Sequence, residues 1–296
     1  MRKNIRAEKN AVPKVKHRSQ GGEIWHRLTR SKTAMISLGF IVLLVFAVVF
    51  APILTPYDFA GIDLRSALQF PSWQHIMGTD QYGRDLFTRL LYGGRISLLV
   101  ALTATAMSIV VGGLIGAAAG YFGGWFDTVA MRIMDVFMAI PGLLMAITVA
   151  AALGTGVFNT AIAVAISNIP SLSRIMRSSV LLLREQEYIE AATAFGSSDA
   201  RIIRKHVIPN TLAPLIVQAT LSIGNAILAI AGLSFIGLGI APPTPEWGSI
   251  LSNSMDQIMS FWPLIIFPGL MIALTMLAFN LLGDGLRDAM DPRLKQ

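Results

Sequence analysis

The chain has 296 residues, of which 54% are hydrophobic and 14% charged, so it is more apolar and less charged than a typical soluble domain. Its net charge of +7 does not indicate a nucleic-acid-binding surface, because most of the basic residues flank apolar segments. The absence of cysteine excludes disulfides, thiolate metal sites and thiol nucleophiles.

The first 32 residues form a basic arm that we expect to lie in the cytoplasm. The arm is longer than the basic region of a signal peptide, and no convincing small-residue cleavage site follows it, which predicts an uncleaved first span. In the stretch GGEIWHRLTRSK, helical spacing places Ile24, Trp25 and Leu28 on one side, which predicts an interfacial helix on the inner leaflet. A disordered arm is the alternative for residues 1–20.

Six apolar segments are each long enough to cross a hydrocarbon core of about 30 Å as a helix. They cover residues 33–54, 96–121, 128–153, 157–174, 212–240 and 261–283. The fourth is the most polar, because Asn159, Ser167, Asn168 and Pro170 interrupt it. The predicted fold class is an all-α membrane protein with six transmembrane helices and an extracytoplasmic segment at residues 55–95.

The distribution of basic residues predicts the orientation. Of the 24 Lys and Arg residues, 20 fall on the side of the N-terminus, while Arg65, Arg84, Arg89 and Arg95 fall on the opposite side. Cytoplasmic loops carry the excess of positive charge, so both termini are expected to be cytoplasmic.

Two spans carry small or charged residues at helical spacing. Gly112, Gly116 and Gly120 recur every four residues in the second span, which predicts a smooth face for close helix packing. Arg132 and Asp135 lie one turn apart in the third span, and we interpret them as a mutually paired couple; a proton or ion relay is the alternative.

Candidates for a translocation cavity come from the third and fifth spans. Gln218, Ser222 and Asn225 form a polar stripe that either bonds to neighbouring helices, the interpretation we favour, or lines a wet cavity. Met138 belongs to a methionine face that is more typical of pliable core than of a ligand surface; its members are Met131, Met134, Met138 and Met145.

The sequence lacks the parts of the zinc, serine and aspartyl hydrolase sites that a membrane enzyme would use. It contains neither an H-E-x-x-H pair nor a G-x-S-x-G elbow, and the predicted topology places Asp58 and Asp284 on opposite membrane faces. No Gly-Lys dipeptide occurs, so a phosphate-binding loop is impossible. Any energy from ATP must therefore come from another chain.

A polar, helix-prone segment at residues 185–210 interrupts the apolar spans. In EYIEAATAFG the spacing predicts a short amphipathic helix whose apolar side comprises Tyr188, Ile189, Ala192 and Phe195. The small side chains of Ala191 and Ala192 leave room for a partner to approach the helix closely.

A turn and a second helix follow. Gly196 is expected to end the first helix with a positive φ, and Ser198 with Asp199 to cap the second. The second helix, DARIIRKHVI, is predicted to end at Pro209, where the fifth span begins. A short, rigid helix–turn–helix of this kind is well suited to bind a soluble partner.

This segment resembles the EAA motif of binding-protein-dependent ABC importer permeases, which is Glu-Ala-Ala, three residues, Gly, nine residues, then Ile-x-Leu-Pro. Glu190, Ala191, Ala192, Gly196 and Pro209 match the motif, whereas His206 and Ile208 replace its Ile and Leu. The resemblance implies that the segment is a coupling helix that docks in a groove of a cytoplasmic ATPase subunit.

Further stretches resemble the C-type permease of dipeptide and oligopeptide importers. In chain order they are GTDQYGRDLFTRLLYGGRISL, GYFGG with MRIMDVFMAIP, APPTPEWGSIL and AFNLLGDGLRDAMDPRLKQ. The resemblance implies a type I ABC importer permease fold, with a permease core at residues 96–285 and a cytoplasmic tail at 286–296. It also implies a multi-pass protein of a prokaryotic cell membrane that works as a heterodimer with a related permease.

The same resemblance implies the remaining partners. Two ATPase subunits would bind ATP and Mg, an extracytoplasmic binding protein would deliver the solute, and this chain would bind no cofactor. Membrane lipid is an expected partner and nucleic acid is not.

Two outer stretches are candidates for docking that binding protein. Asp80, Arg84, Asp85 and Arg89 are spaced for i,i+4 pairs on a helix, which is either a self-satisfied surface helix or a docking ledge. Prolines stiffen PPTPEWG, and Trp247 suits an anchor at the membrane interface. The predicted docking region comprises Asp80, Arg84, Asp85, Glu246 and Trp247.

The resemblance implies import of dipeptides or oligopeptides, with glutathione, a nickel chelate or an opine as alternative solutes. A secondary transporter that works alone is the rival from another class. Such a transporter would need buried carboxylates for ion coupling, and the predicted spans offer only Asp135, near a span end.

Overall fold

The computed structural model describes residues 20–291, which form helices and connecting segments without a strand ladder. Residues 1–19 of the predicted basic arm (1–32) and the last five residues of the predicted tail lie outside the described residues. The α-helices are α1 (Gln20–Leu28), α2 (Lys32–Val49), α3 (Ala51–Leu54), α4 (Leu86–Phe122), α5 (Gly124–Met138), α6 (Gly142–Leu153), α7 (Val157–Arg184), α8 (Glu187–Ala194), α9 (Asp199–Ile202), α10 (Ile208–Phe235), α11 (Trp247–Ser252) and α12 (Pro263–Met290).

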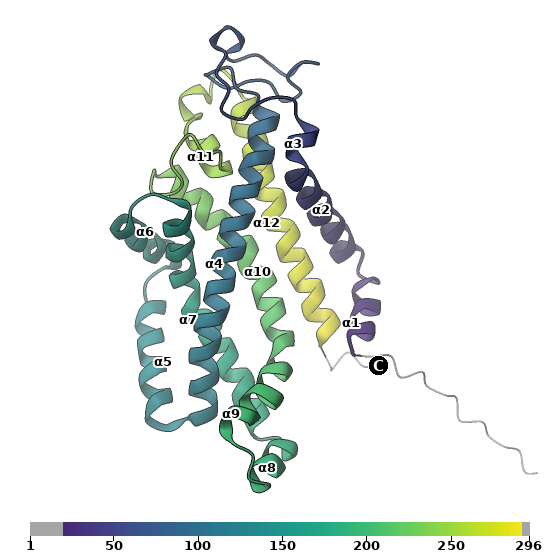
Figure 1. Ribbon diagram of the computed structural model, residues 1–296, viewed down its shortest axis with the longest axis vertical. Coiled ribbons are helices and arrows are strands. Elements are labelled where there is room, and N and C mark those ends of the chain that lie inside the picture. The colour runs from purple at the N-terminus through teal and green to yellow at the C-terminus, as the bar shows by residue number, and fades with distance from the viewer. Residues whose placement is uncertain (1–19, 292–296) are drawn as a thin grey trace, which may run out of the picture.

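The long helices run side by side along one axis (Figure 1). The segment at residues 55–85 and α11 lie at the upper end of that figure, while α8 and α9 lie at the lower end. Helix α1 and the end of α12 also lie toward the lower end, where Arg27 Nη1 donates a 3.2 Å hydrogen bond to the carbonyl oxygen of Asp291. The two described ends of the chain therefore meet.

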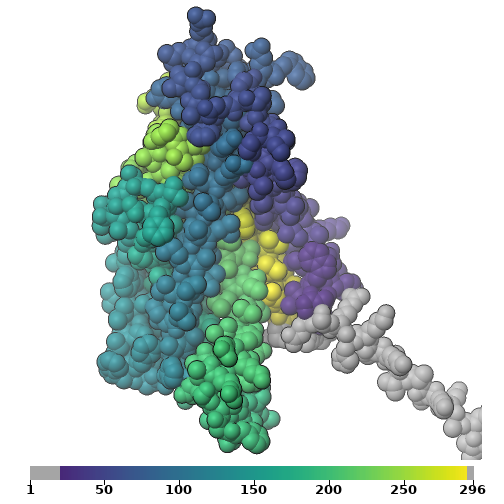
Figure 2. Space-filling view, in the orientation of Figure 1, coloured from purple at the N-terminus to yellow at the C-terminus, as the bar shows by residue number. Residues whose placement is uncertain are grey.

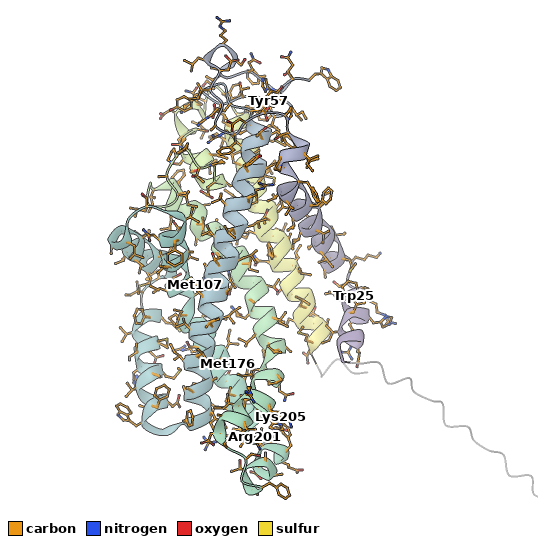
Figure 3. All side chains as sticks on the ribbon, viewed as in Figure 1. Trp25, Tyr57, Met107, Met176, Arg201 and Lys205 are labelled. Atoms are coloured by element: carbon orange, nitrogen blue, oxygen red, sulfur yellow. The ribbon has the colours of Figure 1, made fainter. Side chains whose placement is uncertain are left out.

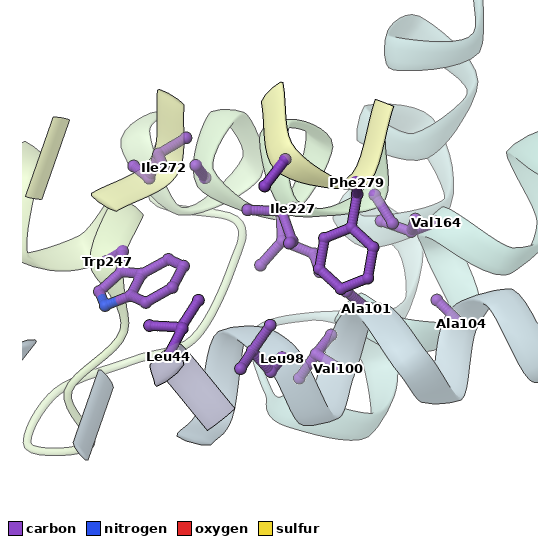
Figure 4. Close-up of a cluster of buried hydrophobic side chains, with 14 of the residues drawn as sticks. Leu44, Leu98, Val100, Ala101, Ala104, Val164, Ile227, Trp247, Ile272 and Phe279 are labelled. Carbon is purple, nitrogen blue, oxygen red and sulfur yellow. The ribbon is translucent and has the colours of Figure 1, made fainter. Parts of the chain in front are cut away.

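One large apolar core joins the long helices. Leu98 and Ala101 of α4 meet Ile227 of α10 and Phe279 of α12, and Trp247 closes the core toward α11 (Figure 4). Close packing of these side chains gains dispersion contacts between the helices and leaves few voids.

Within residues 20–291, four helices are long and apolar enough to cross a membrane: α2, α4, the continuous helix 199–235, and α12. The bent pair α5 and α6 raises the number to five if it counts as one span. The multi-span prediction is thus confirmed at this coarser level. Helix α7, which contains the weakest predicted span, is one continuous helix despite Pro170, but it is more polar than these.

The predicted third span is wrong as a straight helix. Helix α5 ends at Met138, α6 begins at Gly142, and the two are bent by 90°. Pro141 causes the break, since it has no N–H to donate and disfavours a helical conformation in the residue before it.

The predicted helix end at Pro209 is also wrong. Helix α9, a π turn at Ile203–Val207 and α10 follow one another without a gap, so that residues 199–235 form one helix. Pro209 directly follows the π turn, so the helix accommodates the proline at a place where its hydrogen-bond pattern already changes.

The glycine face of α4 is confirmed. A β-carbon added at Gly116 would lie 2.2 Å from the carbonyl oxygen of Ser173 on α7, and Gly112 and Gly120 meet the same helix. Only glycine allows α4 and α7 to approach so closely.

Helix α1 differs from its predicted arrangement. Leu28 is buried and Ile24 packs against the main core, whereas Trp25 is exposed on the outer side of α1 (Figure 3). Leu28 lies against Gly285 of α12. The apolar side of α1 is therefore occupied by the bundle, and Trp25 is the part of it left for other contacts.

Candidate functional site

The predicted coupling segment forms a lobe at the lower end of the bundle. We define the lobe as residues 187–202, which comprise α8, the turn at Gly196 and α9. In the space-filling view the green lobe extends below the rest of the molecule (Figure 2). Figure 3 places Arg201 and Lys205 at this end and Tyr57 at the opposite end.

A small second core anchors the lobe. Ile189 of α8, which is 3% exposed, packs with Ile202 of α9 and Val207 of the π turn. These side chains meet Leu172 and Met176 of α7, and Ala192 adds a partly buried contact. A displacement of the lobe would therefore pull on α7 and α10 together.

The other side of α8 faces outward. Phe195 is 90% exposed, and Glu190 and Ala191 are exposed as well. The predicted apolar side is wrong for Phe195, because six residues of helix place it roughly 240° around the axis from Ile189. Tyr188 is also exposed, at 42%.

The turn at Gly196 has the predicted conformation. Its φ is +75°, and the N–H groups of Gly196 and Ser197 donate to the carbonyl oxygens of Thr193 and Ala192 at 2.9 and 3.1 Å. These two bonds form a Schellman motif, in which glycine is favoured because it tolerates positive φ. The turn fixes the angle between the two lobe helices.

The N-terminal capping of α9 differs from the prediction. Ser198 occupies the N-cap position, but its side chain makes no capping hydrogen bond. Asp199 instead accepts a 2.8 Å hydrogen bond from the hydroxyl of Tyr121 at the end of α4. The lobe is thus tied to α4 as well as to α7 and α10.

A groove of about 660 Å³ lies between the lobe and the ends of α4 and α7. Its lining combines aromatic, charged and small side chains: Tyr121, Phe122, Arg184, Glu190, Thr193 and Asp199. Such a concave, mixed surface beside exposed Phe195 suits a protein partner at this end of the bundle.

His206, which departs from the EAA motif, lies at the junction of the lobe and α10. Its ring centroid is 6.1 Å from that of Tyr188, and its carbonyl oxygen accepts a 2.6 Å hydrogen bond from Asn210. The ring therefore packs across the lobe onto α8, a contact that the sequence alone did not suggest.

The predicted cavity residues do not share one pocket among those found in the described residues. Gln218 lines a hollow of about 360 Å³ with Arg287, Ser222 is buried, and Asn225 is exposed. Met138 lines a separate hollow of about 150 Å³ at the break between α5 and α6.

The charged pair predicted within the third span is wrong. Asp135 forms an ion pair with Arg174 of α7, while Arg132 is exposed. A second pair joins the same two helices, since Arg177 donates to Asp127 at 2.6 Å. Helix α5 is therefore held against α7 by charge at two places.

The first docking stretch is a turn rather than the predicted helix. Asp80 pairs with Arg84 at 2.6 Å as the spacing predicts, but it also lies 3.5 Å from Arg89. Asp85 caps α4 by accepting from the N–H of Thr88 at 2.8 Å and contacts His75 at 3.0 Å. Asp80, Asp85 and Arg89 are buried and only Arg84 is partly exposed, so these residues do not form a solvated surface helix.

The second docking stretch is also buried at its key residues. Trp247 is 0% exposed and its Nε1 donates to the carbonyl oxygen of Leu90 at 2.8 Å, so its predicted role as an interface anchor is wrong. Glu246 caps α11 and accepts a 3.0 Å hydrogen bond from Ser97. Both side chains are buried because the indole N–H of Trp247 and the carboxylate of Glu246 find hydrogen-bond partners on α4.

Comparison with known proteins agrees with this architecture. The family described as “Binding-protein-dependent transport system inner membrane component” matches residues 109–296, and “N-terminal TM domain of oligopeptide transport permease C” matches residues 19–71. The dipeptide transport system permease protein DppC of Alkalihalophilus pseudofirmus is 46% identical over 92% of this chain and 90% of its own. The glutathione transport system permease protein GsiD of Escherichia coli is 44% identical over 97% of this chain and 96% of its own.

A solved structure shares the fold. A chain of the inward-facing MetNI methionine ABC transporter matches with a TM-score of 0.55 and 16% identity, over 68% of this chain and 96% of that one. At this identity the match concerns the fold alone.

Proposed function

The chain belongs to the family of binding-protein-dependent transport system inner membrane components, and from that premise we propose that it imports dipeptides or oligopeptides. As an ABC transporter permease it is a transport subunit and not an enzyme. The peptide class is supported by the similarity to the dipeptide permease. Glutathione is the second candidate, because the relative from Escherichia coli is a glutathione permease and glutathione is itself a small peptide.

The proposed assembly places the lower end of the bundle in the cytoplasm. There the lobe would dock on one of two ATPase subunits, which bind ATP and Mg. A related second permease would complete the path within the cell membrane of a bacterium, and an extracytoplasmic binding protein would deliver solute to the upper end. The permease core would be residues 96–285 and the coupling segment residues 185–210.

One observation carries this proposal: the lobe combines a rigid anchor with an outward-facing aromatic residue. Ile189 fixes α8 to the bundle, whereas Phe195, which follows the groove-lining Ala194 in the chain, is 90% exposed. Aromatic side chains, phenylalanine included, are enriched in protein–protein interfaces. Within the EAA motif, Glu190 lines the groove, Ala191 allows close approach and Gly196 holds the turn.

The proposed alternating access is a two-state motion biased by nucleotide. Closure of the ATPase subunits would move the lobe, and its anchor would pass the movement to α7 and α10. As part of this proposal, Gln218, Ser222, Asn225 and Met138 would contribute to the solute path in a conformation other than this one, in which they do not share one pocket. A path of this kind must bind solute weakly, since tight binding would slow release.

The coupling role is tested with Phe195→Ala in the complete transporter. Loss of an exposed aromatic anchor is expected to weaken retention of the ATPase subunits during purification by roughly tenfold. Uptake of a labelled dipeptide should fall in parallel. The matched control is Phe158→Ala, which removes another exposed phenylalanine (68%) at the start of α7.

A second pair of variants tests the turn. Gly196→Val forces a β-branched residue to positive φ, whereas Gly196→Asn keeps a residue that tolerates it. We expect loss of coupling only for valine. Normal assembly and uptake with both Phe195→Ala and Gly196→Val would contradict the assignment of the lobe.

The solute class is tested by competition. Unlabelled dipeptides, tetrapeptides and glutathione are added to cells that take up a labelled dipeptide through this transporter. Stronger competition by glutathione than by any unmodified peptide would favour the second candidate.

A further inference from the structure

The two outer stretches that the sequence singled out meet around one cavity. Tyr82 and Arg84 of GTDQYGRD, with Arg89 at the start of α4, form one wall. Thr244 and Ser249 of APPTPEWGSIL form the opposite wall, about 160 residues later in the chain. The cavity has a volume of about 290 Å³ and lies at the upper end of the bundle, the end opposite the lobe.

The lining of the cavity carries two cationic side chains, Arg84 and Arg89. Arg84 Nε and Arg89 Nε lie 2.6 and 3.5 Å from the same oxygen, Oδ2 of Asp80. The other oxygen of Asp80 accepts from the N–H groups of Tyr82 and Arg84 at 2.9 and 3.0 Å. One carboxylate therefore faces two guanidinium groups, and its acceptor positions are largely occupied.

The neighbouring carboxylates keep their charge, but their oxygens are bound to other groups. Glu246 is committed to α11, since it accepts from the N–H groups of Gly248 and Ser249 at 2.9 and 2.8 Å. Asp85 is committed to Thr88 and His75. None of the described residues that line the cavity is acidic.

The guanidinium groups keep donors for a ligand. Arg89 uses Nη1 on the carbonyl oxygen of Phe59 at 2.9 Å. Arg84 lies over the ring of Tyr82 at 4.6 Å, which orients its plane, and within residues 20–291 neither of its Nη atoms has a hydrogen bond to protein. Both side chains are recessed, with exposures of 12% and 5%.

We propose that this cavity binds a carboxylate of the incoming solute at the extracytoplasmic mouth of the permease. A planar carboxylate matches the paired N–H groups of a guanidinium, and recessed arginines bind it more strongly than exposed ones. Pro242 and Pro243 provide rigid apolar walls, while Thr244 and Asn253 offer hydrogen bonds that orient the ligand. The inference rests on the proposed function only for the identity of the solute, because every unmodified peptide ends in a carboxylate.

The chain contains no cysteine, so a thiol introduced into it is the only one that this subunit carries in the complete transporter. Asn253→Cys places a single thiol at the cavity, and Trp73→Cys places one at a fully exposed outer position away from it. In intact cells, each thiol is reacted with an anionic or a cationic methanethiosulfonate reagent. We expect the cavity thiol to prefer the anionic reagent by roughly tenfold over the control thiol.

Ligand binding is read from protection of the same thiol. A free dipeptide should slow modification of Asn253→Cys, whereas the same dipeptide with an amidated C-terminus should not. Adding Arg84→Gln should abolish both the preference and the protection, and Arg84→Lys should retain the preference. If Arg84→Gln prevents assembly, raised salt on the Asn253→Cys transporter replaces it, because screening must lower the preference.

The outcomes separate this inference from the proposed function. Protection by the free dipeptide without peptide uptake would support the site and contradict the proposed transport of peptides. Peptide uptake with equal reactivity toward both reagents, or with equal protection by the amidated peptide, would overturn the site. Protection only by the extracytoplasmic binding protein would also overturn it, since the carboxylate would then belong to that partner.

Discussion

The hydroxyl of Tyr121, at the end of α4, donates a 2.8 Å hydrogen bond to the carboxylate of Asp199, the first residue of α9. This bond joins the lobe to a helix that reaches the opposite end of the molecule. It lies beside the groove in which we expect a partner to dock.

Tyr121→Phe is expected to loosen the lobe without unfolding the protein. The lost bond is solvent-accessible and is worth about 1 kcal/mol. We predict normal amounts of assembled transporter but less solute imported per ATP hydrolysed, measured in proteoliposomes. Tyr57→Phe is the control, because Tyr57 donates a similar 2.8 Å bond to the carbonyl oxygen of Gln74 at the other end. An unchanged ratio of transport to hydrolysis in Tyr121→Phe would show that this bond does not serve coupling.

Close packing of α4 on α7 predicts a large difference between two neighbouring glycines. Gly116→Ala would force a β-carbon to within 2.2 Å of Ser173 O, whereas Gly113→Ala would meet nothing within 4 Å. We expect Gly116→Ala to destabilise by about 1–3 kcal/mol and Gly113→Ala to be neutral or stabilising. The thermal unfolding midpoint in detergent measures both. Equal midpoints for the two variants would contradict the packing described here.

Burial of Trp247 predicts that it serves stability rather than contact with the membrane surface. Trp247→Ala should cost about 3–5 kcal/mol, because it opens a cavity and leaves the carbonyl oxygen of Leu90 unpaired. Trp73→Ala, at a side chain that is 103% exposed, should leave the midpoint of thermal unfolding unchanged. An unchanged midpoint for Trp247→Ala would contradict a role of Trp247 in stability and would favour its role as an anchor at the membrane interface.

The ion pair between Asp127 and Arg177 predicts a specific coupling between α5 and α7. Reversing either charge alone, as Asp127→Arg or Arg177→Asp, should destabilise, while the double reversal should recover part of the loss. The pair is partly exposed, so we expect a coupling energy of about 1 kcal/mol in a double-mutant cycle. Strict additivity of the two single effects would show that the pair contributes nothing.

Features that depend on local spacing could be predicted from the sequence. The repeat of Gly112, Gly116 and Gly120 defines a smooth helix face whatever packs on it. The turn at Gly196 follows from a glycine placed just after a short helix, and it was confirmed with φ of +75°. The family, too, was readable from short motifs in order along the chain.

Other features could not be predicted because they depend on which helices become neighbours. Helical spacing allowed Asp135 to pair with Arg132, but α7 presents Arg174, and the pair forms across helices. Likewise, the sequence did not show that Trp247 would fit between α4 and the core. Side-chain periodicity identifies a face, but it does not identify the partner of that face.

What the sequence by itself determined is that the chain holds several membrane-length apolar helices and that a short polar helix ends in a turn at Gly196, since each is encoded by consecutive residues. Only the tertiary structure decided that the lobe rests on α4, α7 and α10, and that two outer stretches join around Arg84 and Arg89. The physical reason is that burial and hydrogen bonding between distant segments are settled by packing of the whole bundle, where each polar group takes the partner that the fold brings to it.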